Sequence, residues 1–405
     1  MTEARSIVVI GAGVVGMATA LTLASRGHRV TVIDAAEGSG LGTSFANGAQ
    51  LSYSYTDALA SPAILTQLPR MLLGREPAFR LHATLQPHFL RWGLAFLRNA
   101  TAERFRRNTL EGLVLALRSR TALQHLTARY HLRYAHQATG KIHLFRSEKS
   151  LAAARAVAEM KAAHGARQQL LGPDEAIALE PMLAAVRAQL TGALYTQDEE
   201  VGDPHSFCKA AARALVGEAG CRALFGTRVR RIDAGHSPAV VTDTGERISA
   251  DRIILSAGVQ SAALARTIGV RLPIVPMKGY SITAPLGPAA PAISITDVAN
   301  RVVFARLDGR MRIAGLADLG RSDTAVEPRR LAALIAGARS ALPEAADYQA
   351  VSASWAGLRP MTPNSLPIIQ PIAEGVIANT GHGALGWTYA AGSAERVADI
   401  VEERG

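Results

Sequence analysis

The first thirty-four residues constrain the fold more than any other part of the chain. A continuous apolar run over 6–10 leads directly into the pattern GAGVVG at 11–16, and residues 14–25 have helical composition. A second, β-branched run over 30–33 ends at Asp34, whose carboxylate can accept hydrogen bonds from ribose hydroxyls. The order of strand, glycine turn, helix, strand and acidic residue is typical of a βαβ unit that binds a dinucleotide.

The glycine turn has a physical reason at each position. Gly11 permits the tight turn, Gly13 lets the backbone approach a pyrophosphate, and Gly16 lets the helix pack closely on the strand. Val14 and Val15 begin the helix, where unpaired N–H groups and the positive end of the helix dipole favour phosphates. The pattern therefore predicts a bound dinucleotide and does not by itself choose between NAD and FAD.

A polar loop follows this unit over residues 42–50 (GTSFANGAQ). Its small hydroxyl, amide and glycine residues could supply hydrogen-bond donors to a pyrophosphate and to a polar ring edge. The same composition also suits a solvent-exposed loop. The candidate ligand contacts are Thr43, Ser44, Asn47, Gly48, Ala49 and Gln50.

The length of 405 residues favours two domains. Alternating strands and helices indicate an α/β, Rossmann-like nucleotide domain interleaved with an α+β, mixed-sheet substrate domain, because a nucleotide-type strand end recurs at Ala257 and Gly258. The predicted nucleotide domain comprises 1–57, 196–270 and 350–405, and the substrate domain comprises 58–195 and 271–349.

Local patterns predict further elements. Helices are expected within 58–130 and at 147–163, 174–183, 328–341 and 386–402. Strands are expected at 140–146, 192–195, 227–232, 239–242, 253–255, 281–283, 302–305 and 311–315.

The composition excludes several classes of protein. Cys208 and Cys221 form neither a metal-type spacing nor a disulfide scaffold, so we expect no metal site and a reducing compartment. The start of the chain lacks a basic segment of the secretory type, and no apolar run approaches the roughly 20 residues that span a bilayer. We therefore expect a cytoplasmic protein that either stays free or associates with the inner face of the membrane.

The net charge of +11 comes largely from one segment, residues 70–107. Its arginines are Arg70, Arg75, Arg80, Arg91, Arg98, Arg104, Arg106 and Arg107, and apolar residues including Leu72, Leu73, Trp92 and Phe96 lie between them. One interpretation is a basic amphipathic helix on anionic lipid; the other is an ordinary helix packed on the substrate domain. No nucleic-acid-binding motif accompanies the charge, so we expect no nucleic-acid partner.

Four stretches of the chain match a known family. They are residues 9–34, TSFANGAQLS (43–52), PMKGYS (276–281), and WAGLRPMTPNSLPII with NTGHGALGWTYAAGS (355–369 and 379–393). In these blocks, and in their order and spacing, the chain resembles the D-amino acid oxidase-like superfamily of FAD enzymes, and within it the small subunits of bacterial D-amino acid dehydrogenases. The resemblance implies a glutathione-reductase-type FAD fold. It also implies noncovalent FAD, because neither cysteine lies in a motif that attaches flavin.

The resemblance also implies roles for individual residues. Arg359, in the GLRP block, would bind the substrate carboxylate through its two-point fork, with a structural salt bridge as the alternative. Tyr55 would help to hold the amino acid, and Tyr280 would face either the substrate or the core. His382 would be either a turn residue near the flavin or an acid–base group.

The cofactor contacts implied by the resemblance lie in three further places. The turn that opens the last helix would stabilise negative charge on the flavin pyrimidine ring, and Trp387 would either contact the ring or pack in the core. The backbone at Val229 would hold adenine, and Gly279 would let a strand approach the ring. The remaining implied contacts are Gly381, Gly383, Leu385, Gly386 and Thr388.

The implied activity is oxidative deamination of D-amino acids by hydride transfer to flavin N5, with electrons passed to a membrane acceptor such as quinone. No Ser/His or His/Asp pairing stands out in the sequence, which fits a reaction without an obligatory side-chain base. Three alternatives stay open: a D-proline or hydroxyproline-type imino-acid dehydrogenase, an oxygen-using amino acid oxidase, and a noncatalytic FAD-binding subunit. The handedness of the substrate rests on the resemblance alone.

Overall fold

The computed structural model describes residues 4–72, 76, 78–218 and 220–403. Arg75, Leu73 and Pro77, which belong to the basic segment, lie outside the described residues. The α-helices are α1 (Val14–Ser25), α2 (Pro62–Leu72), α3 (Pro87–Asn99), α4 (Ala102–Tyr130), α5 (Glu148–Ala162), α6 (Pro173–Leu179), α7 (Pro204–Gly217), α8 (Ser261–Arg266), α9 (Pro328–Ala341) and α10 (Gly386–Glu402). Short 3₁₀ segments are η1 (Pro181–Gln189), η2 (Gly258–Gln260) and η3 (Gly383–Leu385).

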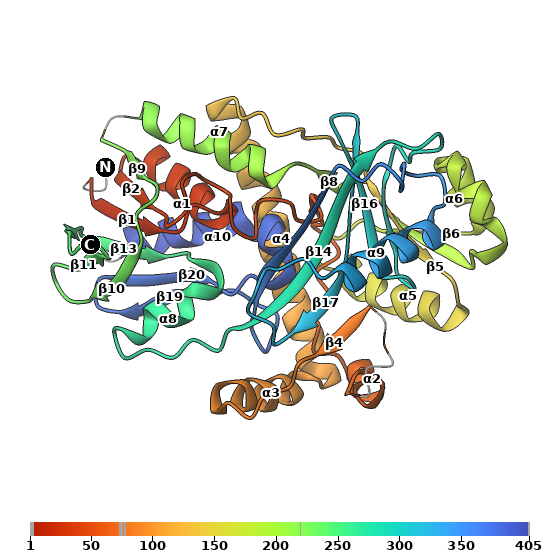
Figure 1. Ribbon diagram of the computed structural model, residues 1–405, viewed down its shortest axis with the longest axis horizontal. Coiled ribbons are helices and arrows are strands. Elements are labelled where there is room, and N and C mark those ends of the chain that lie inside the picture. Colours follow the sequence, from red (N-terminus) through yellow and green to blue (C-terminus); the bar gives the residue numbers. More distant parts are fainter. Residues whose placement is uncertain (1–3, 73–75, 77, 219, 404–405) are drawn as a thin grey trace.

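A six-stranded sheet forms one side of the molecule (Figure 1). Its order is β19 (Ile368–Ala373), β20 (Val376–Thr380), β13 (Arg252–Leu255), β1 (Ser6–Ile10), β2 (Arg29–Ile33) and β9 (Arg222–Leu224). All neighbouring strands run parallel except β19, which is antiparallel to β20. An antiparallel three-stranded sheet comprises β10 (Val229–Asp233), β11 (Ala239–Thr242) and β12 (Arg247–Ser249).

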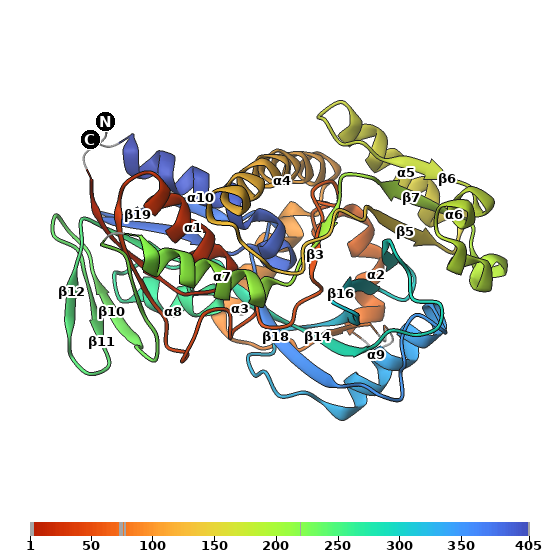
Figure 2. The same cartoon turned by 90° about the horizontal axis from the view of Figure 1, so that it is seen from above.

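The other side of the molecule contains a nine-stranded mixed sheet (Figure 2). Its path is β18 (Ala353–Met361), β14 (Val275–Pro285), β17 (Arg310–Leu319), β16 (Val302–Leu307), β15 (Ser294–Asp297), β5 (Lys141–Phe145), β7 (Gly192–Thr196) and β6 (Gln169–Leu171), with β4 (Phe79–Leu81) paired to β17. A two-stranded sheet of β3 (Gln50–Leu51) and β8 (Glu200–Val201) lies between the two sides.

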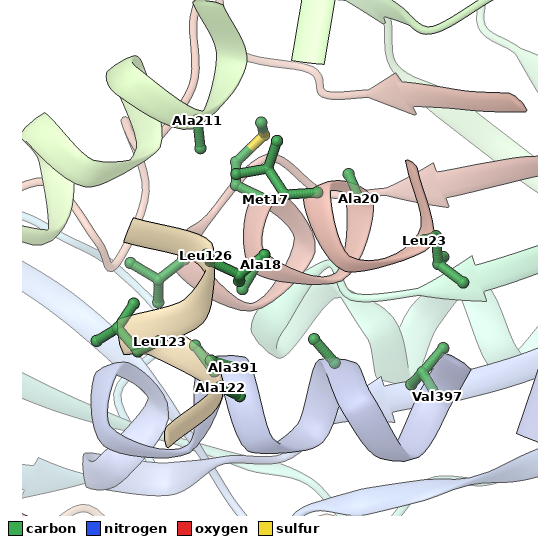
Figure 3. Packing of buried hydrophobic residues seen from close by; sticks show 14 of the residues in the cluster. Met17, Ala18, Ala20, Leu23, Ala122, Leu123, Leu126, Ala211, Ala391 and Val397 are labelled. Atoms are coloured by element: carbon green, nitrogen blue, oxygen red, sulfur yellow. The ribbon is translucent and has the colours of Figure 1, made fainter. Parts of the chain in front are cut away.

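Helix α1 is buried nearly all around, as its almost entirely apolar sequence requires. It packs against α10, α7 and α4 in the largest core cluster, where Met17 and Ala18 meet Ala211, Leu126 and Ala391 (Figure 3). This packing holds the start of α1, and therefore the glycine turn, in a fixed position next to β1.

The sequence predicted many element bounds closely. The helices at 328–341 and 386–402 and the strand at 239–242 are confirmed as α9, α10 and β11. The helix expected at 174–183 is only partly right, because α6 ends at Leu179 and a 3₁₀ segment follows. The strand expected at 281–283 is far longer, since β14 extends over 275–285.

The predicted division into two domains stays a prediction. Strands of the six-stranded sheet come from residues 6–33, 222–255 and 368–380. Strand β18, within the range assigned to the nucleotide domain, pairs with β14 in the nine-stranded sheet. No helix in the described part of the chain is long and apolar enough to cross a bilayer.

Candidate cofactor and substrate site

A cavity of about 1350 Å³ lies between the two large sheets. Its wall includes the carboxyl ends of β1, β2 and β13, at Ile10, Ile33 and Ser256, and continues onto the nine-stranded sheet at Thr296 and Ala314. Ligands of open α/β sheets bind at the carboxyl ends of the strands. The volume exceeds the 300–1,000 Å³ typical of a pocket for one drug-sized molecule, so a dinucleotide together with a small substrate fits it.

The glycine turn has no room for side chains. A Cβ on Gly11, whose φ is +105°, would lie 2.5 Å from the carbonyl oxygen of Ser256 in β13. A Cβ on Gly16 would lie 1.8 Å from the carbonyl oxygen of Gly11. Gly11 and Gly13 line the cavity, whereas Gly16 lies behind it and sets how closely α1 packs on the turn.

The start of α1 faces the cavity. Val14 and Val15 line it, and the backbone N–H of Val14 donates to Ser44 Oγ at 3.1 Å. Asp34, also on the cavity wall, accepts from the N–H of Ala12 at 2.6 Å and from that of Ala36 at 2.8 Å. Each carboxylate oxygen can accept a further hydrogen bond, so these contacts leave Asp34 able to bind a ribose hydroxyl.

The loop at 42–50 joins the two sheets over the cavity. The Thr43 hydroxyl donates to the Leu358 carbonyl of β18 at 2.7 Å, and the Gln50 amide donates to Ser294 Oγ of β15 at 2.7 Å. Asn47 Oδ1 accepts from the N–H of Ala49, which has a φ of +58°. The predicted loop contacts all line the cavity: Thr43, Ser44, Asn47, Gly48, Ala49 and Gln50.

The turn before α10 forms another part of the wall. Gly383 has a φ of +57°, and it lines the cavity together with Leu385, Gly386 and Trp387. The Trp387 indole N–H donates to the Gly202 carbonyl at 3.0 Å, so the ring is held by packing as well as facing the cavity.

Two of the predicted residues in this region lie off the cavity wall. Thr388 Oγ1 accepts from the N–H of Ser52 at 3.0 Å. Gly381, with a φ of +78°, shapes the turn behind the wall.

Arg359 lies on the cavity wall over Gly279. A Cβ on Gly279 would lie 2.4 Å from Arg359 Nη2, so this position of β14 leaves space for the guanidinium. Arg359 Nη1 donates to the Leu316 carbonyl at 3.4 Å, and burial lowers the pKa of the guanidinium despite the opposing effect of Asp318. Among the described residues no carboxylate lies within 4 Å of it.

The other three candidate catalytic residues lie in different surroundings. The Tyr280 hydroxyl donates to Asp318 Oδ2 at 2.8 Å in a core cluster, so its ring lies in the core even though the residue borders the cavity. His382 Nε2 contacts Ser393 Oγ at 3.0 Å, and burial lowers the pKa of the imidazole to about 3. Tyr55 lines the cavity and lies 4.1 Å from His143, measured between ring centroids.

These residues fit FAD. The glycine cradle excludes side chains at the expected places, and Val229, Ala257 and Gly258 line the same cavity. Two buried polar atoms on the wall, Ser256 Oγ and Asn379 Oδ1, have no hydrogen-bond partner among the described residues. Buried polar atoms normally have hydrogen-bond partners, so we expect a bound polar ligand to supply the partners of these two atoms.

Sequence reasoning missed several polar wall residues, among them Lys141, Thr296 and Arg301. They lie on β5, on β15 and just before β16, outside the stretches in which the cofactor contacts were expected. The GKIHLF run predicted a strand at 140–146, but only its partners in the sheet show that Lys141 faces the cavity.

Comparisons with known proteins agree with this architecture. A family model described as DAO, FAD dependent oxidoreductase, matches residues 6–400. The chain is 40% identical to D-amino acid dehydrogenase 2 of Ralstonia nicotianae, over 98% of this chain and 96% of the relative. It is also 40% identical to a D-amino acid dehydrogenase of Paramagnetospirillum magneticum, over 98% of this chain and 95% of the relative.

Solved structures share the fold. Glycine oxidase from Geobacillus kaustophilus superposes with a TM-score of 0.77 at 22% identity, covering 100% of this chain and 96% of its own. L-proline dehydrogenase from P. horikoshii superposes with a TM-score of 0.76 at 18% identity, covering 100% and 94%. At these identities the likeness concerns the fold alone.

Proposed function

Because this chain belongs to the family of FAD-dependent oxidoreductases that matches it over residues 6–400, we propose that it oxidises D-amino acids to 2-oxo acids and ammonia. Similarity to D-amino acid dehydrogenases over nearly the whole chain supports the substrate class and its handedness. The observation that carries the proposal is the Arg359 guanidinium on the cavity wall.

Arg359 has the features of a carboxylate-binding group. Its burial lowers the pKa of the guanidinium, and its hydrogen bond within the described part of the chain is a long one to the Leu316 carbonyl. A buried cation without an anion is unfavourable, and a substrate carboxylate would supply both the charge and a two-point hydrogen-bonding partner. Each charged hydrogen bond contributes about 1.5–3 kcal/mol.

The chain's own contribution to the reaction is to bind and orient the substrate. Bound FAD supplies the hydride acceptor. His382 stays neutral at physiological pH and Tyr280 is engaged with Asp318, so neither is placed as a proton shuttle. Arg359 would fix the α-carboxylate, and this fixes where the α-carbon lies relative to the rest of the cavity.

The electron acceptor that we propose is a membrane quinone, reached by peripheral contact through α3. The inner face of this helix is buried at Trp92 and Phe96, whereas Leu90, Leu94 and Leu97 on the outer face are 52%, 51% and 41% exposed. Arg91 and Arg98 are exposed beside them. Exposed leucines at helical spacing with flanking arginines suit insertion at an anionic lipid surface. Helix α3 lies at the lower edge of the molecule, away from the main cores (Figure 1).

The test is anaerobic reduction of the purified holoenzyme, followed by the loss of flavin absorbance, with a panel of D- and L-amino acids. We expect D-amino acids to bleach the flavin and to support turnover with an artificial dye acceptor. Faster reduction by D-proline than by linear D-amino acids would favour an imino-acid dehydrogenase. Peroxide formation at the full turnover rate in air would favour an oxidase. If no amino acid bleaches the flavin, the proposal is wrong and a noncatalytic subunit becomes the better description.

Arg359→Ala with full FAD content should lower kcat/KM by about ten- to a hundredfold, the value of one charged hydrogen bond. Arg310→Ala, an exposed arginine on β17, is the matched control and should keep the wild-type value. Equal effects of the two variants would contradict the role of Arg359.

A further inference from the structure

The part of the cavity wall next to Arg359 is apolar. It comes from β4, β14 and β17 and from the chain just before α2 and just before α9. Six residues form this apolar wall: Leu59, Phe79, Met277, Leu316, Ala317 and Val326. Among the described residues that line the cavity, the charged ones other than Arg359 belong to other elements: Asp34, Lys141, Arg228, Arg230 and Arg301.

Arg359 and the apolar wall share one face of the nine-stranded sheet. Met277 of β14 pairs with Arg359 of β18, and residues that are directly opposite in a sheet place their side chains on the same face. Gly279, two residues further along β14, belongs to this face as well, and the guanidinium lies over it. The Leu316 carbonyl of β17 accepts from Arg359 Nη1 at 3.4 Å. A carboxylate bound to the guanidinium would therefore lie next to Met277 and Leu316.

Strand β4 and the segment around Leu59 continue the apolar wall away from Arg359. Ala317 of β17 pairs with Phe79 of β4, and β4 lies between β17 and the helices α2 and α3 (Figure 1). The N–H of Leu59 donates to Ser365 Oγ at 2.9 Å, which fixes the backbone there. Leu59, Phe79, Met277 and Ala317 all belong to the core cluster that α2 and α3 cover. The apolar wall is therefore held in shape by packing from behind.

Tyr280 and Thr324 are polar residues that border the apolar wall. The Tyr280 hydroxyl donates to Asp318 Oδ2 at 2.8 Å within a core cluster, so it is already engaged. Thr324 is exposed, and it marks a place where the cavity opens to solvent. An amide or carboxylate in a substrate side chain would lose its hydration on the apolar wall without gaining an equivalent partner, which is unfavourable. An apolar side chain would gain free energy by the same burial.

We propose that the substrate is a D-amino acid with an apolar side chain, of the D-leucine, D-methionine or D-phenylalanine class, and that the apolar wall binds this side chain. The inference rests on the proposed function, in which Arg359 binds the α-carboxylate. It goes beyond that function by assigning the part of the cavity that selects the side chain. The apolar wall begins beside Arg359, so the side chain of an amino acid that Arg359 holds reaches it.

The experiment compares D-leucine, D-asparagine and D-aspartate, whose side chains have nearly the same shape and increasing polarity. For the wild-type holoenzyme with a dye acceptor, we expect kcat/KM to favour D-leucine over D-asparagine by about tenfold or more, the factor that burial of a leucine side chain gives. D-Aspartate should be poorer still, because an unpaired charge is more costly to bury than an amide. A ratio of D-leucine to D-asparagine of one or below would overturn the proposal.

Two variants test the apolar wall itself. Leu59→Asn places an amide there at nearly the same shape and should lower the ratio of D-leucine to D-asparagine by about three- to tenfold, the value of one hydrogen bond. Val326→Thr adds a hydroxyl at a partly buried loop position, should lower the ratio about threefold, and keeps the test valid if Leu59→Asn fails to hold FAD. Leu65→Asn, at a 45% exposed position of α2 outside the cavity wall, is the matched control and should keep the wild-type ratio. A ratio that neither wall variant changes would contradict the assignment.

Binding of the matching acids without an amino group gives a readout that needs no turnover. 4-Methylpentanoate, the analogue of leucine, should perturb the visible spectrum of the oxidised holoenzyme at about a tenth of the concentration of succinamate, the analogue of asparagine. This advantage should shrink in Leu59→Asn and persist in Leu65→Asn. If 4-methylpentanoate binds in this way and no D-amino acid bleaches the flavin, the proposed function falls and the role of the apolar wall stands. If D-amino acids bleach the flavin and 4-methylpentanoate has no advantage over succinamate, the role of the apolar wall is wrong and the proposed function stands.

Discussion

Gly279 and Arg359 show how one residue depends on another at the site. The family resemblance implied that Gly279 lets a strand approach the flavin ring, and the structure adds that any Cβ there would collide with the Arg359 guanidinium. His382, by contrast, is held by a hydrogen bond to a residue of the helix that follows it. Ser393 Oγ donates to the Ala390 carbonyl, so His382 Nε2 carries the proton that the hydroxyl accepts. This tautomer is neutral, in agreement with the lowered pKa of the ring.

The pKa of His382 predicts a specific dependence of stability on pH. The folded-state pKa of about 3 lies below the ordinary value of 6.5, so the unfolded chain binds the extra proton first as pH falls. This residue therefore makes the folded state lose stability from pH 6.5 down to about 3, by up to about 1.4 kcal/mol per pH unit. His382→Gln, whose amide can still donate to Ser393, should flatten this slope in denaturant unfolding at several pH values.

The same variant separates a structural from a catalytic histidine. We expect the pH profile of kcat/KM for His382→Gln to keep the wild-type shape between about pH 6 and 9, because a group with a pKa near 3 does not titrate there. A limb of the profile that disappears in the variant would show instead that His382 acts as an acid or base.

Strand β14 and helix α3 show how far the pattern of residues along the chain predicts a single element. Strand β14 was predicted over three residues but has eleven, and Lys278 and Tyr280 lie buried within it. Their partners, Asp323 and Asp318, come from much later in the chain and make that burial tolerable. For α3 one face is packed in a core cluster and the other exposes leucine and arginine, so the packing interpretation holds for the first face and lipid binding stays a proposal for the second.

The exposed face of α3 gives a prediction about lipid binding. Replacing Leu90, Leu94 and Leu97 together by Gln should weaken binding to anionic vesicles at low salt by at least about tenfold per leucine, since a buried leucine contributes about 1.5–3 kcal/mol. Co-sedimentation with vesicles measures this. Val216→Gln, at a 61% exposed position of α7, is the control and should leave binding intact. Wild-type protein that ignores such vesicles would remove the basis for the membrane proposal.

For the whole molecule, the main consequence of the fold is a cavity shared by two sheets. The glycine turn, Asp34 and the start of α1 come from the six-stranded side, and Arg359, Thr296 and Ala314 come from the nine-stranded side. The 42–50 loop hydrogen-bonds to the nine-stranded sheet at Leu358 and Ser294. A ligand that fills the cavity touches both sides at once, so binding should stabilise them together.

This arrangement predicts that FAD raises the stability of the whole chain and leaves it on unfolding. At a free FAD concentration 100 times its Kd, the folded state should gain about 2.7 kcal/mol, visible as a higher Tm in thermal unfolding. Cys208 and Cys221 are buried and neither lines the cavity, so acid precipitation should release all the flavin into the supernatant. Yellow colour retained in the washed pellet would indicate a covalent link instead.

The order of short-range signals was enough to predict the first βαβ unit, the dinucleotide turn, Asp34 and the last helix, because each depends on residues within about thirty positions of one another. The family resemblance added Arg359 and the glycine turn at 381–386. Only the folded chain revealed that Tyr280 is held by Asp318 and that Lys141, Thr296 and Arg301 line one end of the cavity. These relations arise from contacts between separate segments, 38 residues apart for Tyr280 and Asp318 and more than 100 for the pairing of β15 with β5. A hydrophobic or charged pattern along the chain does not specify which strand will become a neighbour.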